Sequence, residues 1–353
     1  MRIGLYDVDS HRFPNLPLMK ISAWHKAHGD IVEFADHFTH YDKVYVSKVF
    51  GDEYSQMDST VFNADEIIFG GTGFAITVED GKEIYHRDRD KDLPSEIEHI
   101  YPDYSLYPEY TKDTAYGFLT RGCCNNCDFC IVSKKEGLCS RKVADLSEWW
   151  RGQKNIKLLD ANLLACRDRN ELLQQLIDSG ANVDFTQGLD ARFITPEVAL
   201  MLRQVKCSMW HFAFDFMKNE AAIVKGLQTF VDVVGYDPKK CNAYVYVLTN
   251  FNTTFEEDLH RVRLIQSIGL DPDIRIYRKN IAPRKLRDLQ RWCNNRFVYR
   301  SCDFMDYVPR KDGRTIRELY FGGDNDDLYN CANQTAERKR NYAGSRRQME
   351  QEG

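Results

Sequence analysis

Four of the chain's eleven cysteines lie within eight consecutive residues, and the other seven are dispersed. Three of the four have the spacing Cys123-x3-Cys127-x2-Cys130, and an aromatic residue, Phe129, precedes the last of them. Dispersed single cysteines are typically small buried hydrophobic residues. A dense group in a protein without a disulfide scaffold is typical of a metal or redox site. We therefore expect the chemistry of this protein at the grouped cysteines.

The spacing of these cysteines favours an iron–sulfur cluster over a single zinc ion. Three thiolates on one short loop can bind three irons of a cubane cluster and leave the fourth iron without a protein ligand. A structural zinc ion normally takes four ligands, arranged as two separated pairs. The second pair is missing here, because Cys139 stands alone and no Cys-x2-Cys pair recurs later.

The composition excludes several other classes of protein. The 353 residues are 43% hydrophobic and 29% charged, which suits about two domains with packed cores. The formal net charge of −5 does not indicate nucleic-acid binding by the chain as a whole. No run of about 18 apolar residues is present, and the first residues do not resemble a signal peptide. We expect a soluble, cytoplasmic α/β protein with no membrane partner.

The first 80 residues predict a small doubly wound, Rossmann-like domain. Short strand-like runs alternate with one helical pattern, at 2–8, 16–28 (the helix), 31–34, 43–49 and 66–69. Strands that alternate with helical connections indicate a parallel sheet. The glycines of 70–73 follow the last run, as a turn that approaches a ligand or as a plain tight turn. Residues 81–113, rich in charge, Pro and Tyr, are expected to form a surface connector.

A longer alternation over residues 114–284 predicts a partial (β/α) barrel. Its candidate strands are 115–120, 156–159, 183–186, 209–214, 243–248 and 274–277. The cysteine motif directly follows the first of them. In a barrel of this kind the loops at the carboxyl ends of the strands form the site. Residues 285–353 are expected to form a helical extension that ends in a basic, solvated tail.

The cysteine motif in this setting resembles the signature of the radical S-adenosylmethionine (radical SAM) superfamily. The features that match are Cys123-x3-Cys127-x2-Cys130, Phe129 before the third cysteine, and the position after the first strand of a βα domain. The resemblance implies a [4Fe-4S] cluster whose open iron binds the amino and carboxylate groups of S-adenosylmethionine, with Phe129 close to the cofactor. It also implies an external reductant, such as a flavodoxin or a ferredoxin.

The resemblance further implies contacts to S-adenosylmethionine from polar residues at the strand ends. Asp160 or Asn162 would accept a hydrogen bond from the methionine ammonium group, although either residue could instead cap a helix. Arg192 would bind the methionine carboxylate through its forked guanidinium, with an ion pair to Asp190 as the alternative.

Two later strand ends complete the expected cofactor site. Asp215 stands where relatives often carry a Glu and would accept hydrogen bonds from the ribose. Thr249, at the end of the fifth strand, would lie near the adenine. The sequence singles out no catalytic acid, base or nucleophile.

The loop after the first strand raises the question of cobalamin. Cobalamin domains that bind the metal through histidine carry Asp-x-His-x-x-Gly at this place. Here Asp9 and His11 match, but Pro14 stands where the glycine would make room for the nucleotide tail of the cofactor. We therefore expect a cobalamin-like fold that has lost the cofactor.

Together these features predict an enzyme that cleaves S-adenosylmethionine to a 5′-deoxyadenosyl radical and abstracts hydrogen from a substrate. Two alternatives remain open. One is a cobalamin-dependent methyltransferase or a methylthiotransferase-like enzyme. The other is a non-catalytic iron–sulfur or zinc protein that acts in electron transfer or binding.

Overall fold

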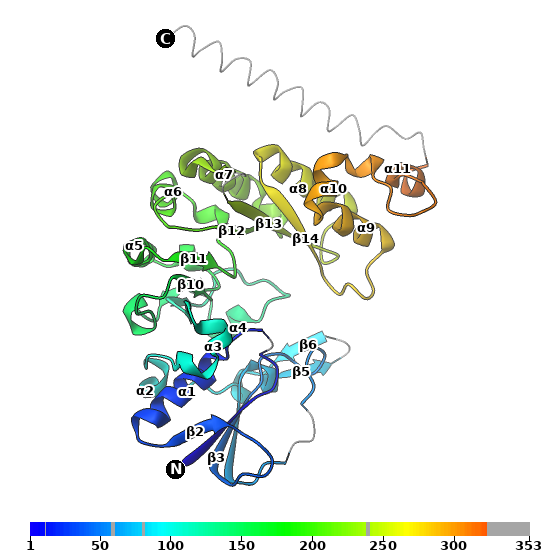
Figure 1. Cartoon of the computed structure of the whole chain (residues 1–353). Coiled ribbons are helices and arrows are strands. Elements are labelled where there is room, and N and C mark those ends of the chain that lie inside the picture. Colours follow the sequence, from blue (N-terminus) through cyan, green and yellow to red (C-terminus); the bar gives the residue numbers. More distant parts are fainter. Residues whose placement is uncertain (11, 58–60, 80–81, 238–240, 323–353) are drawn as a thin grey trace. The chain divides into compact units, whose positions relative to one another are not determined.

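The computed structural model describes residues 1–10, 12–57, 61–79, 82–237 and 241–322. It is a mixed α/β structure with parallel sheets and helices (Figure 1). Internal contacts define two compact units: Met1–Tyr246 with His260–Asp271, and Val247–Leu259 with the residues from Pro272 onward. In the described ranges, no helix is both long enough and apolar enough to cross a membrane.

The first unit begins with a four-stranded parallel sheet in the order β2-β1-β3-β4. Its strands are β1 (Arg2–Asp7), β2 (Ile31–Phe34), β3 (Tyr41–Ser47) and β4 (Ala64–Gly70). Helix α1 (Leu16–Ala27) covers one face of this sheet, where Leu18 and Ile21 pack against Ile3 and Leu5. The helix begins at its cap Asn15, whose side chain accepts a hydrogen bond from the Leu18 amide at 3.2 Å.

No helix separates β2 from β3, although the two strands lie on opposite sides of β1 and run parallel to it. The short segment 35–40 therefore crosses β1 without a helix. Gly4 of β1 allows this close approach, since a Cβ there would lie 3.0 Å from both the Ala35 Cβ and the Val44 Cγ2. The crossing segment helps to cover the second face of the sheet, where the core is formed by Tyr41, Val44, Val46 and Phe62.

The segment that follows, expected to be a surface connector, contains short regular elements. They are an antiparallel hairpin of β5 (Ile76–Glu79) and β6 (Lys82–Tyr85), helix α2 (Ser95–Glu98) and helix α3 (Pro108–Thr111). The segment is anchored to the first sheet, because the Tyr107 hydroxyl donates to Asp7 Oδ2 at 2.6 Å.

A second group of parallel strands carries the cysteine motif. One sheet has the order β11-β10-β7, with β7 (Thr114–Gly117), β10 (Asn155–Leu158) and β11 (Asn182–Phe185). Strand β12 (Met209–Ala213) is parallel to β13 (Asn242–Thr249), and the bridge between Leu189 and Phe212 links the segment after β11 to β12. The helices between these strands are α5 (Arg169–Ser179), α6 (Pro196–Leu202) and α7 (Glu220–Phe230).

Every second residue of β10, β11, β12 and β13 is buried, whereas β7 has three consecutive buried residues. The buried set includes Ile156, Leu158, Val183, Phe185, Trp210, Phe212, Ala243 and Val245. The ring of Phe230, from α7, meets the rings of Trp210 and Phe212 at centroid distances of 5.2 and 4.8 Å. The strands therefore bury one face against helices, and the residues in between point to the other face.

The chain continues through helix α8 (Phe255–Ile268), strand β14 (Asp271–Ile276) and helices α9 (Arg284–Cys293), α10 (Arg296–Ser301) and α11 (Ile316–Tyr320). In the second unit, buried Trp292 contacts the rings of Tyr299 and Phe304. Buried Asp288 accepts a hydrogen bond from the Tyr320 hydroxyl at 2.6 Å. The predicted basic tail lies outside the described residues.

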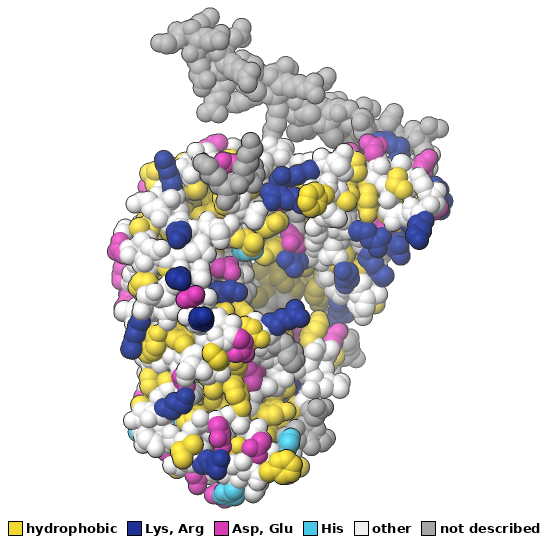
Figure 2. Space-filling model, in the orientation of Figure 1, with side chains coloured by type: hydrophobic (Ala, Val, Ile, Leu, Met, Phe, Trp, Pro, Cys, Tyr) yellow, Lys and Arg dark blue, Asp and Glu magenta, His cyan; other side chains and the backbone are white. Residues whose placement is uncertain are grey.

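Charged side chains of both signs are mixed over the visible surface of the first unit (Figure 2), as the small formal net charge of −5 leads us to expect.

Gly226 lets α7 approach the short 3-10 turn Ala191–Phe193, which carries Arg192. A Cβ at Gly226 would lie 1.8 Å from the Ala191 carbonyl oxygen. That contact involves backbone rather than a flexible side chain, so the helix or the turn would have to move. The spacing between α7 and the Arg192 turn therefore requires a residue without a side chain.

We predict that Gly226→Ala lowers the free energy of unfolding by roughly 1–3 kcal/mol, the range for overpacking. A glycine-to-alanine change inside a helix ordinarily stabilises by about 1 kcal/mol, so a net loss would isolate the clash. Gly70→Ala is the matched control, because a Cβ at Gly70 has no atom within 4 Å. Urea unfolding of the two variants measures the difference. Equal stabilities would contradict this account of the packing.

Candidate active site at the cysteine loop

The cysteines lie on a loop whose two ends are paired. Strand β8 (Thr120–Arg121) pairs with β9 (Arg141–Lys142) in an antiparallel ladder, so residues 122–140 form a closed excursion. A short helix, α4 (Val132–Glu136), occupies the second half of the loop. The ladder holds both ends of the cysteine segment next to the end of β7.

Glu136 ties the start of the loop to its second half. Its carboxylate accepts hydrogen bonds from Arg121 Nη1 at 2.8 Å and from the Gly122 amide at 3.0 Å. Gly122 has φ +91, and a Cβ there would lie 2.2 Å from the Cys139 carbonyl oxygen. Only glycine fits this turn, both for its left-handed backbone and for the close approach. The residue before Cys123 therefore determines the direction in which the motif starts.

The three motif cysteines differ in exposure: Cys123 is buried, whereas Cys127 and Cys130 are half-buried. Cys124 and Cys139 are exposed. Burial raises the pKa of Cys127 to about 12, and the neighbouring thiols and Asp215 add to the effect. Without a bound cation the Cys127 thiol holds its proton at neutral pH, so binding of a metal to it would release that proton.

Asp190 connects the cysteine loop to the loops after β10 and β11. It forms a bidentate ion pair with Arg192, with Nε to Oδ1 at 2.9 Å and Nη2 to Oδ2 at 2.5 Å. The same Oδ2 accepts hydrogen bonds from Asn125 Nδ2 at 3.2 Å and from Asn162 Nδ2 at 3.1 Å. Asn125 in turn accepts a hydrogen bond from Arg192 Nη2. One carboxylate thus joins three separate segments.

The same network reaches the sulfur of Cys123. The Asn125 amide lies 3.4 Å and Asn162 Nδ2 lies 3.7 Å from Cys123 Sγ, and both donate to it. Asn162 also caps a turn, since its Oδ1 accepts from the Ala165 amide at 3.3 Å. Hydrogen bonds to a ligating sulfur tune the reduction potential of an iron–sulfur cluster. Asn162 is therefore a cap, one of the two roles that the sequence left open, and its Nδ2 donates to Cys123; its role toward the methionine ammonium group stays a prediction.

Asp160 is buried beneath the loop rather than on its open side. Its carboxylate accepts the amide of Leu119 at 3.0 Å, together with the amide and hydroxyl of Thr120. These bonds hold the residues that precede β8 to the end of β10. In this arrangement Asp160 positions the backbone that leads into the cysteine loop, and its acceptors are already used.

Phe129, Asp215 and Thr249, the remaining candidate residues, lie in different surroundings. The ring of Phe129 stacks on Phe216 at a centroid distance of 5.9 Å. Asp215, next to Phe216, is near enough for its charge to raise the pKa of Cys127. Thr249 belongs to the second unit, where it is buried and its carbonyl accepts the Tyr277 amide at 2.9 Å.

The donor set is compatible with a cluster that has several irons. In the described part of the chain, no three His, Cys, Asp or Glu side chains converge on one point as a single metal ion would require. A cubane cluster needs no such convergence, because each thiolate binds a different iron. The three thiols share one closed loop, and sulfur hydrogen bonds already surround Cys123.

The loop after β1 contains Asp9, His11 and Pro14, the residues that were compared with a cobalamin-binding motif. The Asp9 carboxylate accepts the amides of Val49 and Phe50 at 2.8 and 2.9 Å, so both of its oxygens hold the segment after β3. His11 lies outside the described residues. Phe13 packs edge-to-face on Tyr116 of β7 at 5.0 Å. This loop therefore joins the first sheet to the sheet that carries the cysteines.

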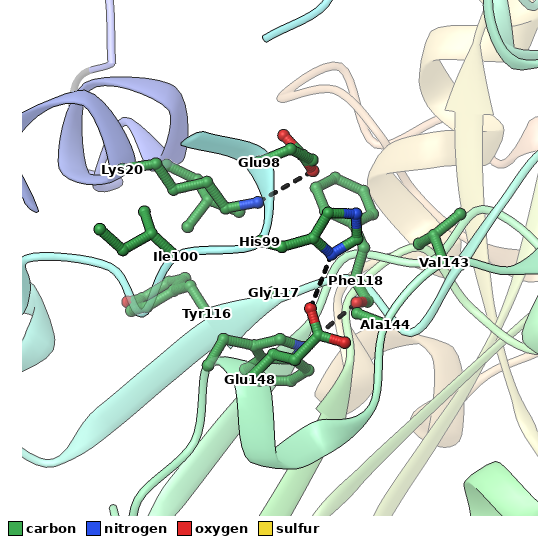
Figure 3. Close-up of a pocket in the computed structure, with 12 residues that line it drawn as sticks. Lys20, Glu98, His99, Ile100, Tyr116, Gly117, Phe118, Val143, Ala144 and Glu148 are labelled. Atoms are coloured by element: carbon green, nitrogen blue, oxygen red, sulfur yellow. Dashed lines mark hydrogen bonds and ion pairs between the residues drawn. The ribbon is translucent and has the colours of Figure 1, made fainter. Parts of the chain in front are cut away.

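A separate small cavity lies between α1, α2 and the end of β7 (Figure 3). It has a volume of about 20 Å³ and contains two ion pairs, Lys20 to Glu98 at 2.9 Å and His99 to Glu148 at 2.8 Å. That volume accommodates a water molecule but no organic ligand. None of its lining residues belongs to the cysteine loop, so the cavity is a packing feature of the first unit.

No family model and no curated protein matches this chain. The argument for function therefore rests on the residues and on their geometry.

Asn125 and Asp190 are the two residues of the site that sequence reasoning did not assign to it. Asn125 lies inside the cysteine motif, and Asp190 entered only as a partner of Arg192. Their side chains come together because the cysteine loop and the loops after β10 and β11 meet in space.

We predict that Asp190→Asn lowers the free energy of unfolding by about 3–5 kcal/mol at pH 7, since Arg192 loses its partner in a partly buried site. Burial would raise the pKa of Asp190, but the hydrogen bonds from Arg192, Asn125 and Asn162 lower it below the ordinary 3.8. Wild-type stabilisation is therefore complete above pH 4 and is lost as the pH falls further. Urea unfolding from pH 7 to pH 3 should show the two proteins converging at low pH. A difference that is constant over this range would contradict the assignment.

Proposed function

We propose that this protein is a radical S-adenosylmethionine enzyme. In this proposal Cys123, Cys127 and Cys130 hold a [4Fe-4S] cluster, and the open iron binds S-adenosylmethionine. A reduced cluster held by these cysteines would supply the one electron for cleavage of the sulfonium to methionine and a 5′-deoxyadenosyl radical. The substrate then loses a hydrogen atom to that radical.

One observation carries the proposal: three cysteines on a closed loop share a hydrogen-bond network with polar residues from two neighbouring strand ends. A zinc site or a simple redox loop needs no such group beside it. Asn162 and Arg192 come from the segments after β10 and β11, where an amino-acid carboxylate and ammonium group would have to be met. The network thus supplies a place for the methionine part of the cofactor.

The side chains have separate tasks in this proposal. Arg192 Nε and Nη2 are held by Asp190 and Asn125, whereas Nη1 donates no hydrogen bond within the part of the chain that is described. That free N–H is available to the methionine carboxylate. Asp215 would accept from the ribose hydroxyls. Asp160 would hold the loop rather than the ammonium group.

The finer fold belongs to the proposal as well. The order β2-β1-β3-β4 is the order of flavodoxin-like doubly wound sheets, which supports a Rossmann-like, cobalamin-like first domain. Strands β7 and β10 to β14 with their helices would form the partial barrel. An external flavodoxin or ferredoxin would supply the electron.

We predict that anaerobic reconstitution loads about four irons per chain. Cys123→Ala, Cys127→Ala and Cys130→Ala should each lose the cluster and the formation of 5′-deoxyadenosine. Cys139→Ala is the matched control, because Cys139 is an exposed cysteine of the same loop. Iron and sulfide analysis, the visible absorbance and a cleavage assay give the readouts.

Full iron content and activity in Cys127→Ala would refute the cluster assignment. Zinc without sulfide would favour a non-catalytic metal protein. A stoichiometric corrinoid complex that is lost in His11→Ala would favour the cobalamin-dependent methyltransferase.

We further predict that Arg192→Ala and Asp215→Ala each weaken S-adenosylmethionine binding by about ten- to a hundredfold, as expected for the loss of a charge-assisted hydrogen bond. Isothermal titration with the cluster-loaded protein measures the affinity. Lys218→Ala, a substitution of a charged residue in the turn after Asp215, is the control and should bind normally. Unchanged affinity in a variant with full iron content would remove that residue from the site.

A further inference from the structure

The strands beside the cysteine loop have a polar row on the face opposite their helices. Lys157 of β10 is paired in register with Tyr116 of β7 on one side and with Asp184 of β11 on the other. His211 of β12 follows, in register with Tyr244 of β13. Because register partners point to the same face, these side chains form one continuous row across the strands.

The row has a defined order from Asp184 to β13. His211 Nε2 lies 3.9 Å from Asp184 Oδ1, and His211 Nδ1 is hydrogen-bonded to the Tyr246 hydroxyl at 2.7 Å. Asp184 Oδ1 is buried and accepts no hydrogen bond from any residue that the structure describes. An unpaired buried carboxylate oxygen costs free energy unless a donor reaches it. His211 Nε2, at 3.9 Å, forms an ion pair with this oxygen only when the imidazole is protonated, so among the described residues Asp184 Oδ1 has no donor at hydrogen-bond distance.

Lys157, in contrast, lacks an anionic partner among the described residues. Its ammonium group lies over the rings of Phe13 and Tyr116, at 5.6 and 5.8 Å from their centroids. No carboxylate of the described chain lies within ion-pair distance of it, not even that of its register partner Asp184. The cation is turned toward these rings rather than toward Asp184 of β11. An anion would supply the charged partner that Lys157 does not find among the described residues.

We propose that Lys157 and Asp184 bind the carboxylate and the ammonium group of an α-amino acid, which is the substrate. The inference rests on the proposed function and adds the substrate class to it. One carbon separates the two charged groups of an amino acid, and side chains on neighbouring strands stand about 4.8 Å apart. The zwitterion can therefore meet both residues at once.

The rings beside the row indicate the kind of side chain. Phe13 and Tyr116 form an edge-to-face pair next to Lys157, and the Tyr244 ring stacks on His211 at 6.4 Å. Such surfaces favour an aromatic or apolar substrate side chain. Phe13 comes from the loop after β1, so the first domain contributes one wall of the site.

The test uses L-phenylalanine as the probe, with the full-length protein and no added S-adenosylmethionine. Isothermal titration compares the amino acid with its methyl ester, which lacks the carboxylate, and with its N-acetyl derivative, which lacks the ammonium group. Lys157→Met and Asp184→Asn should each weaken phenylalanine binding by about ten- to a hundredfold. Lys154→Met, just before β10, and Asp178→Asn, in α5, change exposed residues and are the charge-matched controls, which should bind normally.

The methyl ester and the N-acetyl derivative show which residue binds the carboxylate and which binds the ammonium group. Lys157→Met should not weaken the methyl ester further, and Asp184→Asn should not weaken the N-acetyl derivative further. Melting temperatures are recorded for every variant to detect loss of folding. If Lys157→Met or Asp184→Asn fails to fold, His211→Gln is measured instead, because it keeps the charges of Lys157 and Asp184. We expect His211→Gln to keep the discrimination between phenylalanine and its ester.

Three outcomes would overturn the proposal. They are binding of phenyl phosphate but not of phenylalanine, equal binding of all three amino-acid probes, and loss of phenylalanine binding in Arg192→Ala, which would place the amino acid at Arg192 instead. Iron and sulfide analysis of the same preparations separates this result from the proposed function. Loss of the cluster with intact phenylalanine binding would refute the function and leave the amino-acid site.

Discussion

The carboxylate of Asp190 is the interaction on which the rest of the candidate site depends. It lies where three segments meet: the cysteine loop, the segment after β10 and the turn after β11. Each segment contributes one polar side chain, and each of these side chains donates to the same carboxylate. A neutral residue there could not satisfy a guanidinium and two amides together, because it lacks the charge and the second oxygen. The position of Arg192 and the environment of Cys123 therefore follow from one residue.

Contacts at the two ends of the cysteine loop, rather than contacts of its sulfur atoms, hold the loop in place. Asp160 holds the chain before β8, the β8–β9 ladder closes the loop, and Glu136 joins its beginning to its end. These contacts use backbone amides and exist without any bound group. A loop held in this way can present its thiols to a cluster with little loss of conformational entropy on binding. Gly122 is the residue that makes the first turn possible.

The strands around this loop have two faces with different roles, because successive side chains point to opposite sides. One set packs against the helices and forms the core, while the other set carries Lys157, Asp184 and His211. Because the period of a strand is two, both sets are supplied by the same few residues. These three side chains are half-buried, and Asp184 Oδ1 accepts no hydrogen bond from the described residues. Proteins accept the free-energy cost of such a group mainly at sites that bind a ligand. Phe13, from the first domain, borders this polar face.

The sequence alone determined the element pattern and the reactive residues. The strand at 2–8 and the helix at 16–28 correspond to elements of the structure, because hydrophobic period and capping residues act locally. The cysteine motif was equally visible, since its spacing is a property of one short segment. Strand β6 and the short helices α2 and α3, in the segment expected to be a surface connector, were decided by contacts beyond the local pattern.

Only the tertiary structure decided which polar residues meet. Asp160 and Asn162 stand two positions apart and were equivalent as candidates, yet one is buried under the loop and the other faces Cys123. Asn125 and Asp190 are 65 residues apart and gave no shared signal. The partners of a side chain at a strand end are set by sheet order and by the path of the neighbouring loops. These depend on packing of the whole domain, and a single sequence does not encode them in any local pattern.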